Sequence, residues 1–425
     1  MLSEPNPQHR DSQRPRAFGL LFVIVLIDML GFGLIIPLLP FYAMKFQASA
    51  FEVTMLLAIY SACQFVATPV LGSLSDRVGR RPVLVFSQLG TTTASILLGV
   101  ATAIHFDNPF WGLGLVYLTR VIDGISGGNI SVAQAYISDT TPPSQKAKYM
   151  GLLGAAFGIA FSIGPGLGGV LGHLNEALPP FVAAGMSLTA AVLAYLKLPE
   201  SLQSPINHTP GWHFMRSARL LKQPILGQLV GVWFLSMFAF VMTEAVLALY
   251  LKDVFGFQEL GVGLTFMVAG LIIIIVQGGL IGRLRDWVGE WTIGIAGPLI
   301  FAVAMLMYVE ISLAPVIGLL LLAIVLQAVG RSLQTPAMSS LVAHHAPVAQ
   351  QGAGFGLFHG MGALARVFGP VVAGMVYLAD RPWPPFVVAC GCTILGGIWM
   401  IVIRFQTYHM PDLYAEMPPP ARSTD

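Results

Sequence analysis

The sequence predicts an all-α membrane protein with twelve transmembrane helices arranged as two pseudo-symmetric six-helix bundles. Of its 425 residues, 56% are hydrophobic and only 10% are charged, a composition unlike that of soluble proteins. The apolar residues form runs of about twenty, which at about 1.5 Å per helical residue cross a bilayer. Features of the first half also recur in the second half, which predicts two related bundles.

Hydropathy along the chain places the twelve spans. We expect them near residues 17–41, 52–73, 82–104, 111–136, 147–172, 179–197, 224–251, 261–281, 291–310, 314–338, 351–376 and 383–405. Prolines and a glycine interrupt the chain after the sixth span, where a short surface helix is expected at about 212–222. The predicted domains are a tail at 1–16, a first bundle at 17–198, a linker at 199–223, a second bundle at 224–405 and a tail at 406–425.

The distribution of lysine and arginine predicts the orientation in the membrane. Sixteen of the 22 basic residues fall in the tails or in loops on the same side as the N-terminus, and the opposite loops hold only Lys45, Lys252 and Arg381. Because cytoplasmic loops are enriched in Lys and Arg, both termini are expected in the cytoplasm. The polar first sixteen residues lead into an apolar run too long for a signal-peptide core. We therefore expect a multi-pass protein of the cell membrane.

The internal repeat relates the two halves. Arg120 in the fourth span has a counterpart in Arg331, and Gly164-Pro165 has one in Gly369-Pro370. Each half holds six spans, so the repeat is parallel, about an axis normal to the membrane. This arrangement predicts two bundles that face a central cavity.

The loop at residues 72–82, Gly-Ser-Leu-Ser-Asp-Arg-Val-Gly-Arg-Arg-Pro, carries more charge than its length requires. It resembles the cytoplasmic signature loop of the major facilitator superfamily, Gly-x-Leu-x-Asp-Arg-x-Gly-Arg-Arg/Lys. The resemblance implies the major facilitator fold and a latch in which Asp76 caps the eleventh span, near Gly352, while an arginine pairs with Asp139. The residues assigned to this latch are Gly72, Asp76, Arg77, Gly79, Arg80, Arg81 and Asp139. The alternative is that the arginines only enforce orientation.

The first span contains a carboxylate at mid-membrane depth, Asp28, within Asp-Met-Leu-Gly-Phe-Gly-Leu-Ile-Ile-Pro-Leu-Leu-Pro. A charge at this depth costs about 2.5–3.5 kcal/mol on insertion scales, so it is expected to be functional. The segment resembles the first span of tetracycline-type drug/proton antiporters. That resemblance implies that Asp28 lies in the substrate and proton pathway. The alternative is a carboxylate that only bonds neighbouring helices.

The fourth span contains Arg120 and Asp123, three residues apart and therefore on one helix face. The segment resembles the Arg-x-x-x-Gly motif of the same superfamily, in which the arginine is implicated in proton coupling. We expect Arg120 to hold Asp28 or Asp123 ionised; a purely structural ion pair is the alternative. Gln64 in the second span is a further candidate for the cavity lining, and a position that faces lipid is the alternative.

The fifth span is rich in glycine around a Gly-Pro pair. It resembles the antiporter signature Gly-Pro-x-x-Gly-Gly, which implies export rather than import. The residues assigned to this motif are Gly158, Gly164, Pro165, Gly168 and Gly169. Small residues at this spacing also allow close helix contact, so generic packing is the alternative.

The second half contributes Glu244, Arg366 and His359 as candidate cavity residues. A carboxylate among aromatic side chains suits a cationic or polar drug, whereas an ion pair that closes the outer gate is the alternative. Arg366, at mid-span, is expected to face the cavity or an anionic partner such as Glu244. His359 is the least specific of the three, because a single histidine in a packed helix is more often structural.

Other chemistries lack a signal in the sequence. There is no nucleotide-binding Gly-Lys-Ser/Thr motif, no His/Cys cluster with metal-ligand spacing and no nucleophile–base arrangement, and the three cysteines lie in apolar runs. We therefore expect no enzyme activity, cofactor, metal or nucleic-acid partner. The sequence favours a monomeric, bacterial, proton-coupled antiporter in the lipid bilayer that exports small amphipathic compounds, of the multidrug or tetracycline-resistance type. Transport of a defined metabolite, or a sensor that does not transport, are the alternatives.

Overall fold

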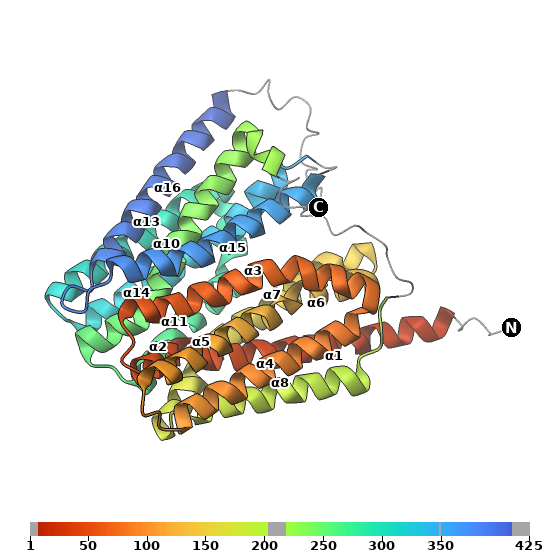
Figure 1. The fold of residues 1–425 in the computed structure, drawn as a ribbon. Coiled ribbons are helices and arrows are strands. Elements are labelled where there is room, and N and C mark those ends of the chain that lie inside the picture. Colours follow the sequence, from red (N-terminus) through yellow and green to blue (C-terminus); the bar gives the residue numbers. More distant parts are fainter. Residues whose placement is uncertain (1–6, 203–217, 348–349, 410–425) are drawn as a thin grey trace.

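The computed structural model describes residues 7–202, 218–347 and 350–409, which are helical throughout with no strand among them. Within these ranges, eleven helices are long and apolar enough to cross a membrane. Figure 1 shows two groups of helices, one from each half of the chain. The all-α class and the membrane-spanning character expected from the hydropathy are therefore observed.

The first group contains the helices that precede the linker. They are α1 (Pro7–Ile35), η1 (Ile36–Leu38), α2 (Leu39–Met44), α3 (Ala50–Val78), α4 (Arg80–Ala103), α5 (Pro109–Ser126), η2 (Gly127–Asn129), α6 (Ile130–Thr140), α7 (Pro143–Leu174) and α8 (Leu178–Lys197). Helix α1 packs against α7 and α8, and α4 packs against α5 and α8. We refer to this group as the first bundle.

The second group contains the helices that follow the linker. They are η3 (Ala218–Lys222), α10 (Pro224–Phe255), α11 (Glu259–Ile275), the π-helical turn η4 (Val276–Leu280), α12 (Ile281–Val288), α13 (Glu290–Leu313), α14 (Ile317–His345), α15 (Gln351–Val376) and α16 (Pro384–His409). Helix α13 packs against α14 and α16, and α10 packs against α15 and α16. We refer to this group as the second bundle. Only the last part of the surface helix expected at about 212–222 falls within the described residues, as η3.

The span expected at 111–136 is not one regular helix. It consists of α5 and α6 joined by the 3₁₀ turn η2, so it is not one of the eleven long apolar helices. At this turn, a β-carbon added to Gly128 would lie only 3.0 Å from the backbone nitrogen of Thr68 in α3. The close approach to α3 therefore coincides with the break in helical geometry.

Local sequence signals set several helix ends. Ser49 and Glu52 form a reciprocal capping box that starts α3. Asn108 caps α5, whose first residue is proline, and Gly256 ends α10 in the left-handed conformation. These signals fix where the spans begin and end, independently of the hydrophobic pattern.

The two bundles meet through α7 with α11 and through α3 with α15. A β-carbon on Gly263 of α11 would lie 2.7 Å from Cα of Gly169 in α7, and one on Gly374 of α15 would collide with Thr54 near the start of α3. We call the end where these contacts lie, beside α2, the closed end, and the opposite end, which holds the α3–α4 loop and the linker, the linker end. In Figure 1 the bundles converge at the closed end and diverge toward the linker end.

Candidate functional site

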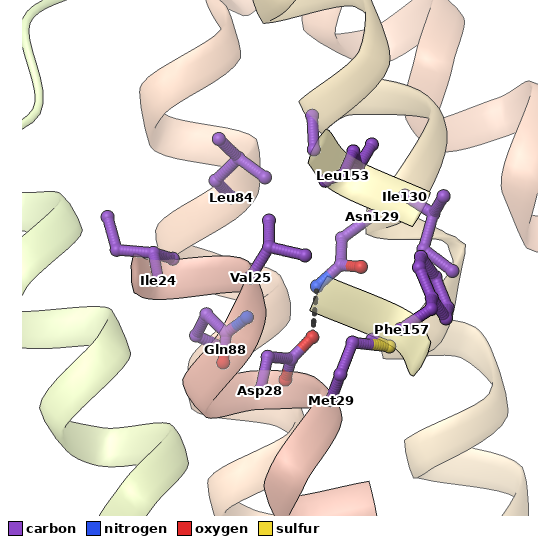
Figure 2. A pocket seen from close by; sticks show the side chains of 11 residues that line it. Ile24, Val25, Asp28, Met29, Leu84, Gln88, Asn129, Ile130, Leu153 and Phe157 are labelled. Atoms are coloured by element: carbon purple, nitrogen blue, oxygen red, sulfur yellow. Dashed lines mark hydrogen bonds between the residues drawn. The ribbon is translucent and has the colours of Figure 1, made fainter. Parts of the chain in front are cut away.

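Asp28 lies inside the first bundle. It is 7% exposed, and Asn129 of η2 donates a hydrogen bond from Nδ2 to Asp28 Oδ2 at 3.3 Å (Figure 2). Gln88 of α4 approaches it from the other side. The pocket around Asp28 has a volume of about 10 Å³, near the lower limit for one water molecule. It is lined by Ile24, Val25, Met29, Leu84, Gln88, Asn129, Ile130, Ala133, Leu153 and Phe157. A pocket of this size suits a proton or one water molecule, and it is too small for a drug-sized compound.

Arg120 and Asp123 form a buried ion pair within α5. Arg120 Nη1 lies 3.3 Å from Asp123 Oδ2, and the two side chains are 2% and 8% exposed. Of the two partners expected for Arg120, the structure selects Asp123 rather than Asp28. Asp123 nevertheless lies within electrostatic reach of Asp28, so the ion pair and the carboxylate of Asp28 are neighbouring charged groups in the first bundle.

Gln64 faces the first bundle rather than lipid. Its Nε2 donates to the carbonyl of Gly127 at 3.0 Å and to the hydroxyl of Tyr60 at 3.2 Å. The carbonyl is available because the helix is irregular at η2. Tyr60 in turn lies near Asp123 and, across the bundle interface, near Arg366 of α15. The neutral Tyr60 side chain is therefore a neighbour of charged groups in both bundles.

A second charged cluster lies in the second bundle. Glu244 of α10 interacts electrostatically with Arg331 of α14 and with Arg366 of α15, and all three are partly buried. The ion pair expected between Glu244 and Arg366 is not among the ion pairs of the described residues, so the two groups interact at longer range. His359 is exposed and lies within the electrostatic reach of Arg366. The cluster holds two arginines and one carboxylate, so its local charge is positive.

Aromatic side chains surround Arg331. The carbon at the centre of its guanidinium lies 4.3 Å from the centre of the Phe240 ring and 5.2 Å from that of Trp233. Its Nη2 also contacts Met237 Sδ at 3.1 Å. Such cation–π contacts stabilise a guanidinium where water is scarce. Arg331 therefore has a defined place in the cluster beyond general contact between helices.

The glycines of the fifth-span motif contact helices of both bundles. Within the first bundle, Gly164 packs on Gly33 of α1, and a β-carbon on Gly168 would lie 2.3 Å from the Leu34 carbonyl oxygen. On the other side of α7, Gly169 packs against Gly263 of α11. Gly158 is less crowded, with only Ile274 nearby. The α7 segment around Pro165 thus joins α1, which carries Asp28, to the second bundle.

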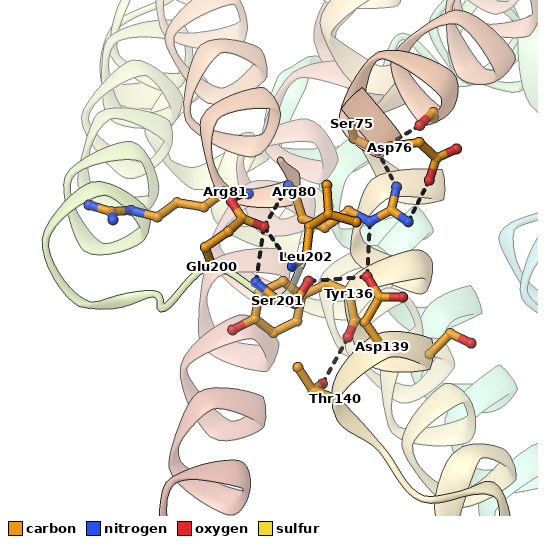
Figure 3. A network of polar contacts seen from close by, with 12 residues as sticks. Ser75, Asp76, Arg80, Arg81, Tyr136, Asp139, Thr140, Glu200, Ser201 and Leu202 are labelled. Atoms are coloured by element: carbon orange, nitrogen blue, oxygen red, sulfur yellow. Dashed lines mark hydrogen bonds and ion pairs between the residues drawn. The ribbon is translucent and has the colours of Figure 1, made fainter. Parts of the chain in front are cut away.

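The signature loop forms a network centred on Arg80 (Figure 3). Its guanidinium binds Asp76 at 2.6 Å and Asp139 at 3.0 Å, and it donates to Ser75 Oγ at 2.6 Å. Of the three arginines considered for Asp139, Arg80 is therefore the one that pairs. The cap that Asp76 was expected to place on α15 is not formed in this conformation, because Asp76 binds Arg80 and the bundles diverge at the linker end.

Glu200, at the start of the linker, binds the first turn of α4. It accepts hydrogen bonds from the backbone nitrogens of Arg80 at 2.8 Å and Arg81 at 3.0 Å (Figure 3). A carboxylate at a helix N-terminus is favoured by the helix dipole. Gly79, with φ of +110°, allows this approach, since a β-carbon there would lie 2.6 Å from Glu200 Oε2. Arg81 also stacks on Tyr195, whereas Arg77 is exposed.

Several residues of the site were not singled out from the sequence. Asn129, Gln88 and Tyr60 are uncharged, and only the fold brings them beside Asp28 and Asp123. Arg331 did carry a signal, because it is an intramembrane arginine at the repeat position of Arg120. Glu200 is the first acidic residue after the sixth span, but its position gives no indication that it caps α4.

The chain is similar to known families and sequences over most of its length. The profile of the family described as "Major Facilitator Superfamily" matches residues 21–314 and 293–422. The class B tetracycline resistance protein of Escherichia coli is 30% identical, over 90% of this chain and 91% of that protein. Multidrug resistance protein 1 of Bacillus subtilis is 27% identical over 86% of this chain and 90% of its own length.

Solved structures share the fold. The human organic anion transporter MFSD10 (TETRAN) superposes with a TM-score of 0.66 at 24% identity, over 93% of this chain and all of that chain. A peptide transporter POT superposes with a TM-score of 0.75 at 14% identity, over 92% of this chain and 94% of that one. These similarities show that the chain shares the two-bundle fold of these transporters.

Proposed function

Because the chain belongs to the major facilitator superfamily and is a multi-pass protein of the cell membrane, we propose that it is a proton-coupled exporter of small amphipathic compounds that works by alternating access. Its family and fold are those of a membrane transporter. Its relatives include tetracycline and multidrug resistance proteins, which supports export of drug-like compounds.

The proposal includes a topology of twelve spans with both termini in the cytoplasm. The discontinuous α5–η2–α6 segment is then the twelfth span, beside the eleven continuous ones. With this orientation the linker end is cytoplasmic and the closed end is external. The conformation described above is then inward-facing, in which cytoplasmic substrate reaches the space between the bundles.

The observation that carries the proposal is the buried charged group of the first bundle. Asp28, Arg120 and Asp123 lie together at membrane depth, where unneeded charges are costly, and Asp28 borders a pocket of water size. This arrangement suits a proton-binding site better than a substrate site. We assign proton exchange to Asp28. The Arg120–Asp123 pair supplies the fixed charges near Asp28 that influence its affinity for a proton.

Contacts between the two bundles couple the protonation of Asp28 to substrate binding in the second bundle. Gly164 and Gly168 of α7 pack on α1 near Asp28, while Gly169 packs on α11 of the second bundle. Tyr60 lies near both Asp123 of the first bundle and Arg366 of the second. Protonation of Asp28 in the outward-facing state changes the charge of the first bundle, and these contacts transmit the change to the substrate cluster around Glu244, Arg331 and Arg366.

Transport in proteoliposomes tests the proposal. The purified protein is reconstituted with a pH-sensitive dye inside, and tetracycline, rhodamine 123 and fluorescein are added in turn under an imposed pH gradient. The proposal predicts that at least one of them moves against its gradient while the pH gradient collapses faster than in protein-free liposomes. If none of the three moves under the pH gradient, the proposal fails, and movement driven only by a sodium gradient would likewise contradict proton coupling. Competition by sugars or amino acids rather than by these dyes would indicate a metabolite transporter.

A further inference from the structure

Two buried hydrogen-bond donors in the second bundle have no partner within the described part of the chain. They are Nη1 of Arg331 and Nε1 of Trp233. They belong to neighbouring groups, because the Arg331 guanidinium lies over the Trp233 ring, and Trp233 is only 3% exposed. Buried donors are almost always paired in folded proteins, so two adjacent exceptions require an explanation.

Both of these groups can only donate. A guanidinium and an indole N–H have no lone pair to offer, so the missing partner must be a hydrogen-bond acceptor. The surrounding charge specifies the acceptor further, since Arg331 and Arg366 outnumber Glu244. An anionic oxygen, as in a carboxylate, enolate or sulfonate, satisfies both the hydrogen bonding and the charge.

Gly362 of α15 lies directly beside the indole nitrogen. A β-carbon added to Gly362 would lie 3.1 Å from Trp233 Nε1, so a larger residue at this position would cover the N–H, whereas the glycine leaves it uncovered by any side chain of α15. Aromatic rings border the same place: Phe358 stacks on Trp233 at 4.3 Å, and Phe240 lies 4.3 Å from the Arg331 guanidinium. Rings of this kind bind the flat apolar part of a ligand.

We infer that Trp233, Arg331 and Gly362 form a subsite for the anionic group of a flat amphipathic substrate, with Arg366 adding positive charge and Glu244 limiting the affinity. The inference rests on the proposed function, because it names the substrate class of the same transporter. It departs from the preference for cationic drugs that Glu244 alone suggests.

Two xanthene dyes of opposite charge test this inference directly. Binding of fluorescein, which is anionic, and of rhodamine 123, which is cationic, is measured by fluorescence polarisation on the purified full chain in detergent. The inference predicts tighter binding of fluorescein, a loss of at least tenfold in fluorescein affinity for Arg331→Gln, and little change for rhodamine 123. Glu244→Gln is expected to raise fluorescein affinity severalfold, because it removes the negative charge nearest the subsite.

Matched controls separate the subsite from general effects. Arg404→Gln removes an exposed arginine of α16, and Trp111→Phe removes an exposed indole of α5; neither is expected to change dye binding. Trp233→Phe keeps a ring while removing the N–H donor, so it should weaken fluorescein binding severalfold even if Arg331→Gln does not fold. Equal binding of the two dyes, or fluorescein binding unchanged by both Trp233→Phe and Glu244→Gln, would overturn the inference.

The binding experiment tests the subsite, and the transport experiment tests the proposed exporter, so either one can fail without the other. Charge-selective binding that depends on Trp233 and Arg331 supports the subsite even if a pH gradient drives no transport. Transport of rhodamine 123 driven by a pH gradient, with no fluorescein binding, supports the exporter and overturns the subsite.

Discussion

Arg120 and Asp123 form an ion pair, 3.3 Å apart, that is almost completely shielded from water, yet Arg120 Nη2 has no hydrogen-bond partner among the residues that the structure describes. A structural ion pair usually satisfies its donors, whereas this one retains a free donor in the bundle that holds Asp28. The pair therefore combines a stabilising contact with a charge that is available to interact with other groups.

Breaking this pair on one side should destabilise the protein more than removing it altogether. Asp123→Asn leaves Arg120 buried without a counter-charge, a situation that costs about 3–5 kcal/mol in soluble proteins. The double variant Arg120→Gln/Asp123→Asn should regain part of this loss in thermal unfolding in detergent. Glu310→Gln, at an exposed carboxylate of α13, serves as the control. A double variant less stable than both single variants would show that the pair is not a coupled unit.

Asp76 is expected to affect the rate of transport rather than substrate binding. In the described conformation it binds Arg80 at the linker end, where the bundles diverge, so it can reach α15 only when the bundles approach there. Asp76→Asn should reduce the turnover rate about tenfold or more while the dissociation constant for substrate stays within about twofold, since removing one such interaction costs about 1.4 kcal/mol or more. A comparable loss of affinity would place Asp76 in substrate binding instead.

The contact between Gly263 and Gly169 at the closed end is expected to stabilise the described conformation relative to one in which the closed end is open. Gly263→Ala places a methyl group against Gly169, which disfavours the described conformation relative to one in which the closed end opens. Spin labels at Leu74→Cys and Gly352→Cys, in a variant without the natural cysteines, report the distance across the linker end by electron paramagnetic resonance. Gly263→Ala should shift the distribution to shorter distances, whereas Gly185→Ala, which has open space around it, should not. Identical distributions would exclude this contact as a determinant.

The sequence predicted what depends on local pattern and failed where the outcome depends on helix rotation or conformational state. Hydropathy placed the spans, and a spacing of three residues made Asp123 one of the two partners expected for Arg120, the other being Asp28. The rotation of α1 decides that Asp28 faces Asn129 and Gln88, and no local pattern specifies that rotation. The partner of Asp76 depends on which conformation the bundles adopt. The surroundings of Arg331 have no local signal in the sequence, because the aromatic rings around it lie on α10, more than ninety residues earlier.

The central claim, that Asp28 couples transport to protons, is tested most directly by comparing two transport modes of one variant in proteoliposomes. Asp28→Asn removes the titratable group but keeps the size and hydrogen-bonding capacity of the side chain. It should retain exchange of labelled for unlabelled substrate in the absence of a gradient, and it should lose accumulation driven by a pH gradient by more than tenfold. Accumulation by Asp28→Asn at the wild-type rate under the same pH gradient would contradict the account.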